Sequence, residues 1–258
     1  ADGEKMQLSY AVQNTHRSVG TRTSSHIVKQ FGMRNTLQAD HLTVKLQGSA
    51  GQSLGAFAAP GLKLEVSGDA NDYVGKGLSG GTIVVRPPMA TPIVASENTI
   101  IGNTVLYGAT DGYLFAAGRA GERFAVRNSG AKVVIEGCGS NGCEYMTGGV
   151  AVILGSIGAN FGAGMTGGMA YLYDPSGATP ALINHETLVT CPVTVPHWVT
   201  QLEELLERHV EETGSQKAAD ILQHWDIEQA NFVQICPKEM LVHLPAPLTI
   251  EETAIPAE

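Results

Sequence analysis

The sequence predicts an all-β protein, a right-handed parallel β-helix of about seven rungs with a period of ~19 residues and short flanking helices. Three observations predict this fold. Glycine is abundant, at 31 of 258 residues, and charged residues make up only 16% of the chain. In addition, short apolar runs preceded by glycine recur at a nearly constant spacing between residues 61 and 173.

The repeated runs are rich in Val, Ile, Leu and Tyr, which suits a strand. They begin at Leu62, Thr82, Tyr113, Ala131, Val150 and Met169. Successive starts lie 20, 31, 18, 19 and 19 residues apart, and the longest step contains an insertion around 87–92. His41–Leu46 fits as an earlier rung. No unit can also hold a helix of about 10 residues, so the repeat indicates strands stacked into a solenoid.

Glycines between the runs predict tight corners, because glycine adopts positive φ without steric cost. We expect Gly148, in a glycine pair, to hold positive φ and to lie against the neighbouring rung. Charges nearly vanish between Ala131 and Tyr173, where only Lys132, Glu136 and Glu144 occur. Such a run is expected of parallel strands that are buried on both faces.

Helices are predicted on both sides of the repeats. Thr23–Phe31 forms a short helix ended by Gly32. A longer helix from His197 places one set of apolar residues on a single face: Trp198, Leu202, Leu205, Leu206 and Val210. Gly214 ends this helix, and Ser215 caps a second one that runs to about Trp225. We expect His197 and His209 on the helix surface.

The chain therefore divides into four parts. Residues 1–40 form a linker segment with a short helix, and residues 41–183 form the β-helix. Residues 184–240 hold a final strand and two carboxy-terminal helices, and residues 241–258 form a loose tail. Two parts outside the coil, Asn14–Gly32 and the helix from His197 to Thr213, are the expected docking surfaces.

Composition excludes some partners. The net charge of −9 and the pI near 5.3 argue against nucleic acid and anionic membranes, which both require a basic face. No apolar stretch of about 18 residues predicts a membrane span. Four cysteines in a chain of this length are expected to be free thiols, and we expect a cytoplasmic protein.

Two glycine motifs match phosphate-binding loops only in part. Gly137–Gly142 matches G-x-G-x-x-G, but a strand-like run follows it where a dinucleotide site needs a helix. Gly75-Lys76-Gly77 lacks the hydroxyl residue of a P-loop. Both are interpreted as corner glycines of the coil.

Candidate metal and acid–base residues are sparse. Cys138 and Cys143 are too few for a four-thiolate site and are expected to be buried or at a corner. His185-Glu186 has no third ligand nearby, whereas Asp69 and Asp72 lie in one rung and leave open a sugar-cleaving site. We predict no catalytic, no cofactor-binding and no metal-binding residue in this chain.

Several longer motifs resemble one family. They are Gly68–Gly77, Ile101–Thr104, Leu106–Thr110, Gly121–Ala131, Gly142–Gly149 and Asn160–Gly168, with Asn14-Thr15 and Arg17–Gly20 before the coil and His209-Val210 and Thr213–Gln216 after it. They resemble the carboxy-terminal domain of the glutamate synthase large subunit over about residues 8–240. A subunit of formylmethanofuran dehydrogenase resembles the same coil, but the flanking motifs fit glutamate synthase better.

The resemblance implies a division of labour in nitrogen assimilation. In that family an amidotransferase domain releases ammonia from glutamine, and a domain with FMN and an iron–sulfur cluster reduces the 2-iminoglutarate made from 2-oxoglutarate. The β-helix holds these two domains of the same large subunit together and contacts the electron-donating small subunit only indirectly. The chain alone is then no enzyme and carries no cofactor, but belongs to an NADPH- or ferredoxin-dependent oxidoreductase.

Two other functions stay open from the sequence. One is a free-standing β-helix enzyme that acts on carbohydrate, which would need acidic and basic side chains clustered on one sheet face. The other is an independent interaction module built on the same coil. The low charge of the repeats favours the scaffold over the carbohydrate enzyme.

Overall fold

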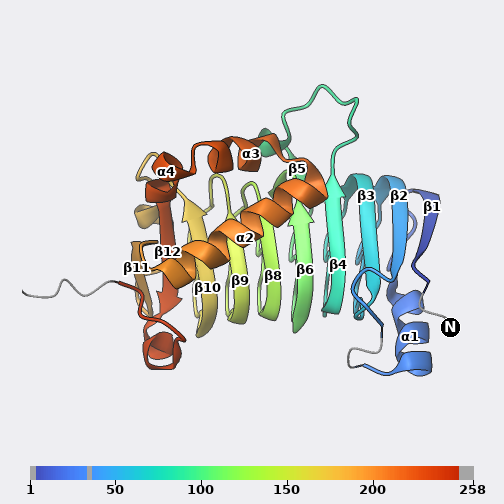
Figure 1. The fold of residues 1–258 in the computed structure, drawn as a ribbon, viewed down its shortest axis with the longest axis horizontal. Helices are drawn as coiled ribbons and strands as arrows, with labels where there is room; N and C mark the ends of the chain where they lie inside the picture. The colour runs from blue at the N-terminus through green and yellow to red at the C-terminus, as the bar shows by residue number, and fades with distance from the viewer. Residues whose placement is uncertain (1–3, 34–36, 250–258) are drawn as a thin grey trace, which may run out of the picture.

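A computed structural model describes residues 4–33 and 37–249, and within them twelve strands form one sheet (Figure 1). The strands are β1 (Met6–Val12), β2 (Leu42–Ala50), β3 (Leu62–Ala70), β4 (Ser79–Arg86), β5 (Thr99–Ile101), β6 (Asp111–Ala116), β7 (Arg119–Ala120), β8 (Ser129–Ile135), β9 (Thr147–Ile153), β10 (Gly167–Tyr173), β11 (Leu188–Pro192) and β12 (Phe232–Pro237). The helices are α1 (Thr21–Phe31), α2 (Pro196–Thr213), α3 (Gln216–Gln223) and α4 (Trp225–Glu228), with short 3₁₀ turns η1 (Ala95–Glu97), η2 (Thr179–Leu182), η3 (Gln229–Asn231) and η4 (Lys238–His243).

The repeats stack as parallel strands in sequence order. The path runs β1-β2-β3-β4-β6-β8-β9-β10, and each neighbouring pair on it is parallel. Leu64 pairs with Ile83, Ile83 with Leu114, and Leu114 with Val133, which gives steps of 19, 31 and 19 residues. These pairings confirm the repeat and place the insertion between β4 and β6, where a long loop leaves the sheet (Figure 1).

From β6 to β10 the sheet is buried on both faces by two separate apolar clusters. Along β6, Leu114 and Ala116 point into an inner core between the strands and the turns that connect them. Phe115 points the opposite way, into an outer core with Trp198 and Leu202 of α2. Successive side chains of a strand alternate between faces, so β6, β8, β9 and β10 need apolar residues on both faces. This explains the scarcity of charge in the repeats.

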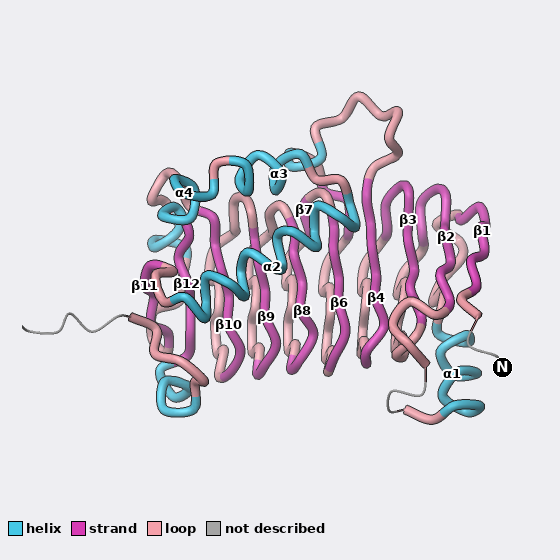
Figure 2. The backbone as a smooth tube through the Cα atoms, in the orientation of Figure 1, coloured by secondary structure: helices cyan, strands magenta, loops and turns pink. Residues whose placement is uncertain are grey.

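The connections between strands also stack on one another, behind the sheet in Figure 2. The backbone N–H of Leu106 donates to Val74 O at 2.8 Å, and that of Ala125 donates to Val105 O at 2.9 Å. The next turn continues the series, because Cys143 N donates to Phe124 O at 2.7 Å. These bonds satisfy backbone groups that the inner core would otherwise leave without partners.

The all-β prediction with short flanking helices is confirmed, but the sheet is mixed and not closed. β12 pairs antiparallel with β10, and β11 pairs antiparallel with β12. The sequence predicts one final strand where the structure has two, so β12 was missed, and β1 falls in the segment predicted as a linker. The finer prediction of a right-handed parallel β-helix of about seven rungs stays a prediction.

The helix predictions agree closely with the structure. α1 begins two residues before the predicted start and ends at Gly32, whose N–H donates to Val28 O. Gly214 ends α2 in the left-handed conformation, with φ 69°. The Ser215 hydroxyl accepts a hydrogen bond from Ala218 N at 3.1 Å and so caps α3. A capping hydroxyl of this kind satisfies an otherwise free N–H of the first turn.

The predicted loose tail is wrong for the residues just after η4. Trp198 Nε1 donates to Pro247 O at 2.8 Å, and Gln234 Nε2 donates to Leu248 O at 2.9 Å. Leu248 is buried in the outer core. The rest of the predicted tail, from residue 250, lies outside the described residues.

The expectation for Gly148 is correct in its contact and wrong in its backbone angle. The positive φ of this glycine pair, 85°, belongs to Gly149. At Gly148 the constraint is crowding alone, because an added Cβ would fall far inside contact distance of the Ser129 carbonyl oxygen on the neighbouring strand. The predicted contact between rungs is therefore present, but its physical cause is the strand spacing and not the backbone dihedral.

We expect Gly148→Ala to lower the free energy of unfolding by about 2 kcal/mol or more, because two hydrogen-bonded backbones must separate to admit the methyl group. The matched control is Gly108→Ala, at φ 65° with no atom within 4 Å of the added Cβ. It should cost only the left-handed strain of about 1 kcal/mol. Denaturant unfolding of both variants measures this, and equal costs would contradict the crowding account.

Candidate functional site

Two of the four cysteines lie in the inner core, between β8 and β9. Cys138 and Cys143 are buried, and all four cysteines are free. Burial raises the pKa of Cys138 to about 12, against the opposing effects of Gly158 N–H and the Arg119 charge. Burial likewise raises the pKa of Cys143. Both stay protonated at neutral pH, which makes them poor nucleophiles and metal ligands. The prediction of buried cysteines is confirmed.

The two glycine motifs lie in turns that lead into strands. β9 follows Gly137–Gly142, and an added Cβ on Gly142 would meet the Phe161 ring at 2.8 Å. β4 follows Gly75–Gly77, and an added Cβ on Gly77 would lie 2.5 Å from the Phe57 ring. Neither motif opens a helix that could hold a phosphate at its N-terminus. Their interpretation as turn glycines is confirmed.

The acidic pair is engaged in contacts between rungs. Asp69 accepts a hydrogen bond from Ser49 Oγ at 3.1 Å. Asp72 Oδ1 accepts from Asn103 N at 2.8 Å and from Asn103 Nδ2 at 3.2 Å. In turn, Asn103 Oδ1 accepts from Glu122 N at 2.8 Å. These side chains tie neighbouring turns together and do not converge as an acid and a base.

The remaining candidate ligands are also held by the fold. His185 Nε2 lies 2.7 Å from Pro180 O, and Lys238 Nζ donates to Glu186 O at 2.9 Å. Within residues 4–33 and 37–249, no three His, Cys, Asp or Glu side chains are grouped to hold a metal ion. In the same part of the chain, no helix is long and apolar enough to cross a membrane.

The surface position expected for His209 is wrong. His197 is exposed, but His209 is fully buried, with its ring 6.1 Å from that of Phe115. His209 Nε2 lies 3.8 Å from Oε1 of the buried Glu136, which also accepts a hydrogen bond from Ser215 Oγ. This polar group lies where the turn between α2 and α3 meets the sheet. It links the carboxy-terminal end of α2 to the turn that follows β8.

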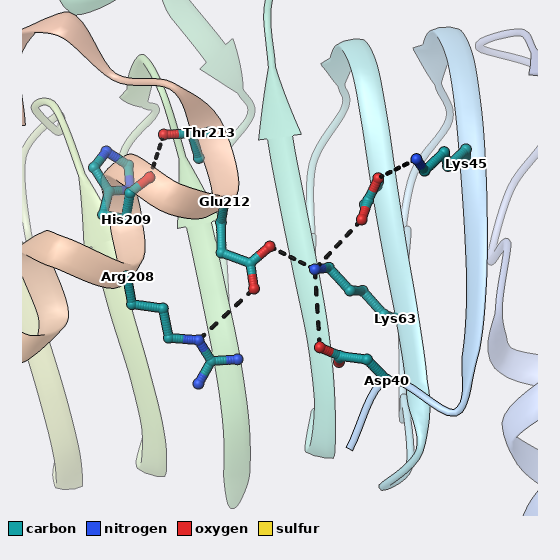
Figure 3. Close-up of polar contacts among 8 residues, drawn as sticks. Asp40, Lys45, Lys63, Arg208, His209, Glu212 and Thr213 are labelled. Atoms are coloured by element: carbon teal, nitrogen blue, oxygen red, sulfur yellow. Dashed lines mark hydrogen bonds and ion pairs between the residues drawn. The ribbon is translucent and has the colours of Figure 1, made fainter. Parts of the chain in front are cut away.

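A second polar cluster attaches the same end of α2 to the amino-terminal strands (Figure 3). Lys63 Nζ of β3 lies 2.5 Å from Glu212 Oε2, 3.3 Å from Glu65 Oε1 and 3.8 Å from Asp40 Oδ2. Arg208 Nε lies 3.7 Å from the other oxygen of Glu212. We call these five residues the helix–sheet ion cluster.

The central pair of this cluster is largely removed from water. The side chains of Lys63 and Glu212 are 13% and 10% exposed. Burial alone would lower the pKa of Lys63, but the hydrogen bond and charge of Glu212, with Asp40 and Glu65, outweigh burial and raise it. The lysine is therefore charged at neutral pH. The cluster could not be found from the sequence because its members are up to 172 residues apart, from Asp40 to Glu212.

The turns behind the sheet share an unusual backbone pattern. In six segments every second residue has positive φ, and we call these segments the alternating turns. They are 53–57, 73–77, 104–108, 123–127, 141–145 and 160–164. In 73–77 the three angles are 63°, 66° and 63°, at Tyr73, Gly75 and Gly77. A pattern of glycine at every second residue is the sequence that this backbone favours.

A family model for the GXGXG motif matches residues 1–238. The chain belongs to the GXGXG family. Several left-handed positions of the alternating turns in this chain carry side chains other than glycine. Thr104, Arg123 and Arg127 have φ of 58°, 56° and 53°. Each such residue costs about 1–2 kcal/mol relative to glycine.

Curated relatives of this GXGXG chain are glutamate synthases. The chain is 62% identical over 257 residues to "Glutamate synthase [NADPH] large chain" of Azospirillum brasilense. It is 51% identical over 229 residues to "Ferredoxin-dependent glutamate synthase 2" of Synechocystis and 46% identical over 237 residues to the NADPH enzyme's large chain of Bacillus subtilis. The resemblance stated from the sequence motifs is confirmed.

The match covers nearly all of this GXGXG chain but little of each relative. It spans 100%, 89% and 92% of the chain, and 17%, 15% and 16% of those three relatives. The chain therefore spans about one sixth of the length of these relatives.

We expect the Lys63–Glu212 pair to contribute to stability as a coupled unit. Lys63→Met leaves Glu212 with only the longer contact to Arg208, and should lower the free energy of unfolding by about 2 kcal/mol. Glu212→Gln should cost a similar amount, and the double variant less than the sum of the two. Denaturant unfolding of the three variants measures this coupling. Additive costs would show that the pair does not couple α2 to β3.

Proposed function

We propose that this chain is a structural scaffold domain of a glutamate synthase large subunit. It would hold the glutamine amidotransferase domain and the FMN/iron–sulfur synthase domain of the same subunit at a fixed separation, and contribute no chemistry of its own. The observation that carries the proposal is the match itself. The whole chain aligns at 62% identity with 17% of a glutamate synthase large chain, so the similarity lies in one defined part of that enzyme.

The proposal includes the finer description of the fold. Residues 41–183 would form a right-handed parallel β-helix, with residues 1–40, 184–240 and 241–258 as its flanking parts. The parallel register from β1 to β10 supports this, as do the hydrogen bonds between successive alternating turns. The right hand is the usual one for a parallel strand-to-strand crossover.

The stack of rungs is expected to be rigid along its axis, which suits a domain that keeps two other domains apart. Neighbouring strands in a sheet lie roughly 4.8 Å apart, and each rung is held by backbone hydrogen bonds on the strand side and on the turn side. Side chains of two cores fill the space between these layers. Compressing or bending such a stack breaks many contacts at once, because close-packed interiors resist deformation. A domain of this kind can fix the distance between two active sites.

The chemistry of the parent enzyme is assigned to its other parts. The thiols of this chain are poor nucleophiles, since burial raises the pKa of Cys236 to about 11 and that of Cys138 to about 12. FMN and the iron–sulfur cluster would be bound elsewhere in the large subunit. The small electron-donating subunit would be an indirect partner in the cytoplasm. The hydrogen-bonding roles of Asp69 and Asp72 argue against a carbohydrate enzyme.

We expect the purified chain to show no flavin or iron–sulfur absorbance and no saturable binding of NADPH. The physical reason is that its G-x-G-x-x-G turn leads into a strand, and that its four thiols have raised pKa values, three of them in buried cysteines. A visible spectrum after reconstitution with FMN, iron and sulfide, with titration calorimetry against NADPH, measures both. Micromolar binding of NADPH would contradict the proposal.

We expect glutamine-dependent glutamate synthesis by the parent enzyme to depend on this chain. The comparison is between the complete large subunit with its electron-donating partner and a version that lacks residues 41–240. Each domain's separate reaction should persist in the shortened version, whereas the coupled reaction should fall at least tenfold because ammonia is no longer delivered. Full coupled activity without this region would contradict the scaffold role. Turnover of glutamine and 2-oxoglutarate by the chain alone would contradict the absence of chemistry.

A further inference from the structure

A hollow of about 440 Å³ lies on the outer side of four neighbouring alternating turns, 73–77, 104–108, 123–127 and 141–145. We call it the cationic hollow. Its lining includes Tyr73, Lys76, Tyr107, Arg123, Arg127 and Tyr145. The Lys76 ammonium lies 6.0 Å above the centre of the Tyr73 ring. Tyrosine and arginine are the residues most enriched at energetically important protein contacts.

Four of these six lining residues occupy positions where the backbone favours glycine. Tyr73, Arg123, Arg127 and Tyr145 have φ of 63°, 56°, 53° and 53°. At the last position of the turn, which Arg127 and Tyr145 occupy, other turns place glycine, as at Gly77 and Gly164. Strained residues of this kind persist where a side chain has a use that outweighs its cost to stability, and they gather at binding sites.

Packing accounts for some of these side chains but not for all. The Tyr145 ring covers Gly164 of the next turn, since an added Cβ there would enter the ring. Arg123 Nε donates to Glu144 Oε2 at 2.9 Å. Arg127, by contrast, is exposed and contacts no carboxylate among residues 4–33 and 37–249. Its side chain therefore has no visible role in the fold of this chain.

The charge of the hollow is opposite to that of the chain. Three cations line it and no Asp or Glu among the described residues does, whereas the chain as a whole carries a net charge of −9. Arginine binds carboxylates through paired N–H groups, and tyrosine hydroxyls add further donors. The hollow is open and shallow, with Tyr145 51% exposed and Tyr73 38% exposed. It is therefore better suited to a protein surface than to a small ligand, which needs an enclosing pocket.

We propose that the cationic hollow is a docking surface for an acidic protein surface, rich in Asp and Glu, on another domain of the same large subunit. This inference rests on the proposed function and names the face through which the scaffold contacts a neighbour. Arg127 and Lys76 make the contact with carboxylates, and the tyrosines pack around them. Neither the expected docking segment Asn14–Gly32 nor α2 contributes to this face.

The first test separates binding from folding at Arg127. Arg127→Gly removes the side chain and relieves the left-handed backbone, so the chain's thermal midpoint should stay unchanged or rise. Arg127→Lys keeps both the charge and the strain and serves as the matched control. A clear drop in the midpoint of Arg127→Gly would show that the arginine serves the fold, and this would overturn the inference.

The second test measures contact in the complete large subunit by hydroxyl-radical footprinting. The rings of Tyr73 and Tyr107 should be oxidised at least threefold more slowly there than in the 258-residue chain. Arg127→Gly combined with Lys76→Gln should abolish this protection, and Arg127→Lys should keep it. Equal oxidation rates in the complete subunit and the chain, or protection that persists in the double variant, would overturn the inference.

Two further outcomes distinguish a docking face from a small-anion site and from a failure of the scaffold function. If citrate or inorganic phosphate protects the isolated chain saturably at millimolar concentration, the hollow is a small-anion site and the docking proposal fails. If the tyrosines are unprotected but coupled activity still requires residues 41–240, only the docking face is wrong and the scaffold function stands. Full coupled activity without that region would overturn the scaffold function itself.

Discussion

The close approach of one rung to the next is the constraint on which this structure depends. Neighbouring rungs lie so close together that no side chain fits where it would point at the backbone of the next rung. An added Cβ at Gly130 would meet the Thr110 carbonyl oxygen, and one at Gly167 would meet that of Thr147, each far inside contact distance. Glycine is required there for space, whatever its φ. The abundance of glycine and the regular period are therefore two results of one stacking geometry.

Stacking also determines what must cover the outside of the sheet. Along each of these strands, the residues that do not point into the inner core face the other side of the sheet. They form a second apolar surface that includes Phe115, Val134 and Val152. Helix α2 crosses this surface and buries it (Figure 1). The helix–sheet ion cluster and the His209–Glu136 contact lie at the carboxy-terminal end of α2. Apolar burial holds the helix on the sheet, and these polar contacts fix its position along the stack.

The features that the sequence could predict are those encoded within a single repeat or helix. The strand runs, the insertion after β4 and the caps at Gly214 and Ser215 each depend on a few adjacent residues. β1 was missed because its alternating Met6, Leu8 and Tyr10 do not form the glycine-preceded apolar run of the other repeats, although such alternation is itself typical of a strand with one exposed face. The burial of His209 could have been inferred, since it lies seven residues after Leu202 and four before Thr213, on the buried face of α2.

The sites that could not be predicted depend on residues that only the fold brings together. At 123–127 the sequence Arg-Phe-Ala-Val-Arg carries no glycine, yet its backbone alternates like that of the glycine-containing turns. The hydrogen bonds and buried residues of the stack impose that conformation on a sequence that disfavours it locally. In each alternating turn the second and third positions are buried, and only the outer positions can vary without disturbing the core. Chemistry specific to one protein is therefore expected at those outer positions, and the cationic hollow includes 123–127 and 141–145, the two alternating turns with no glycine at a left-handed position.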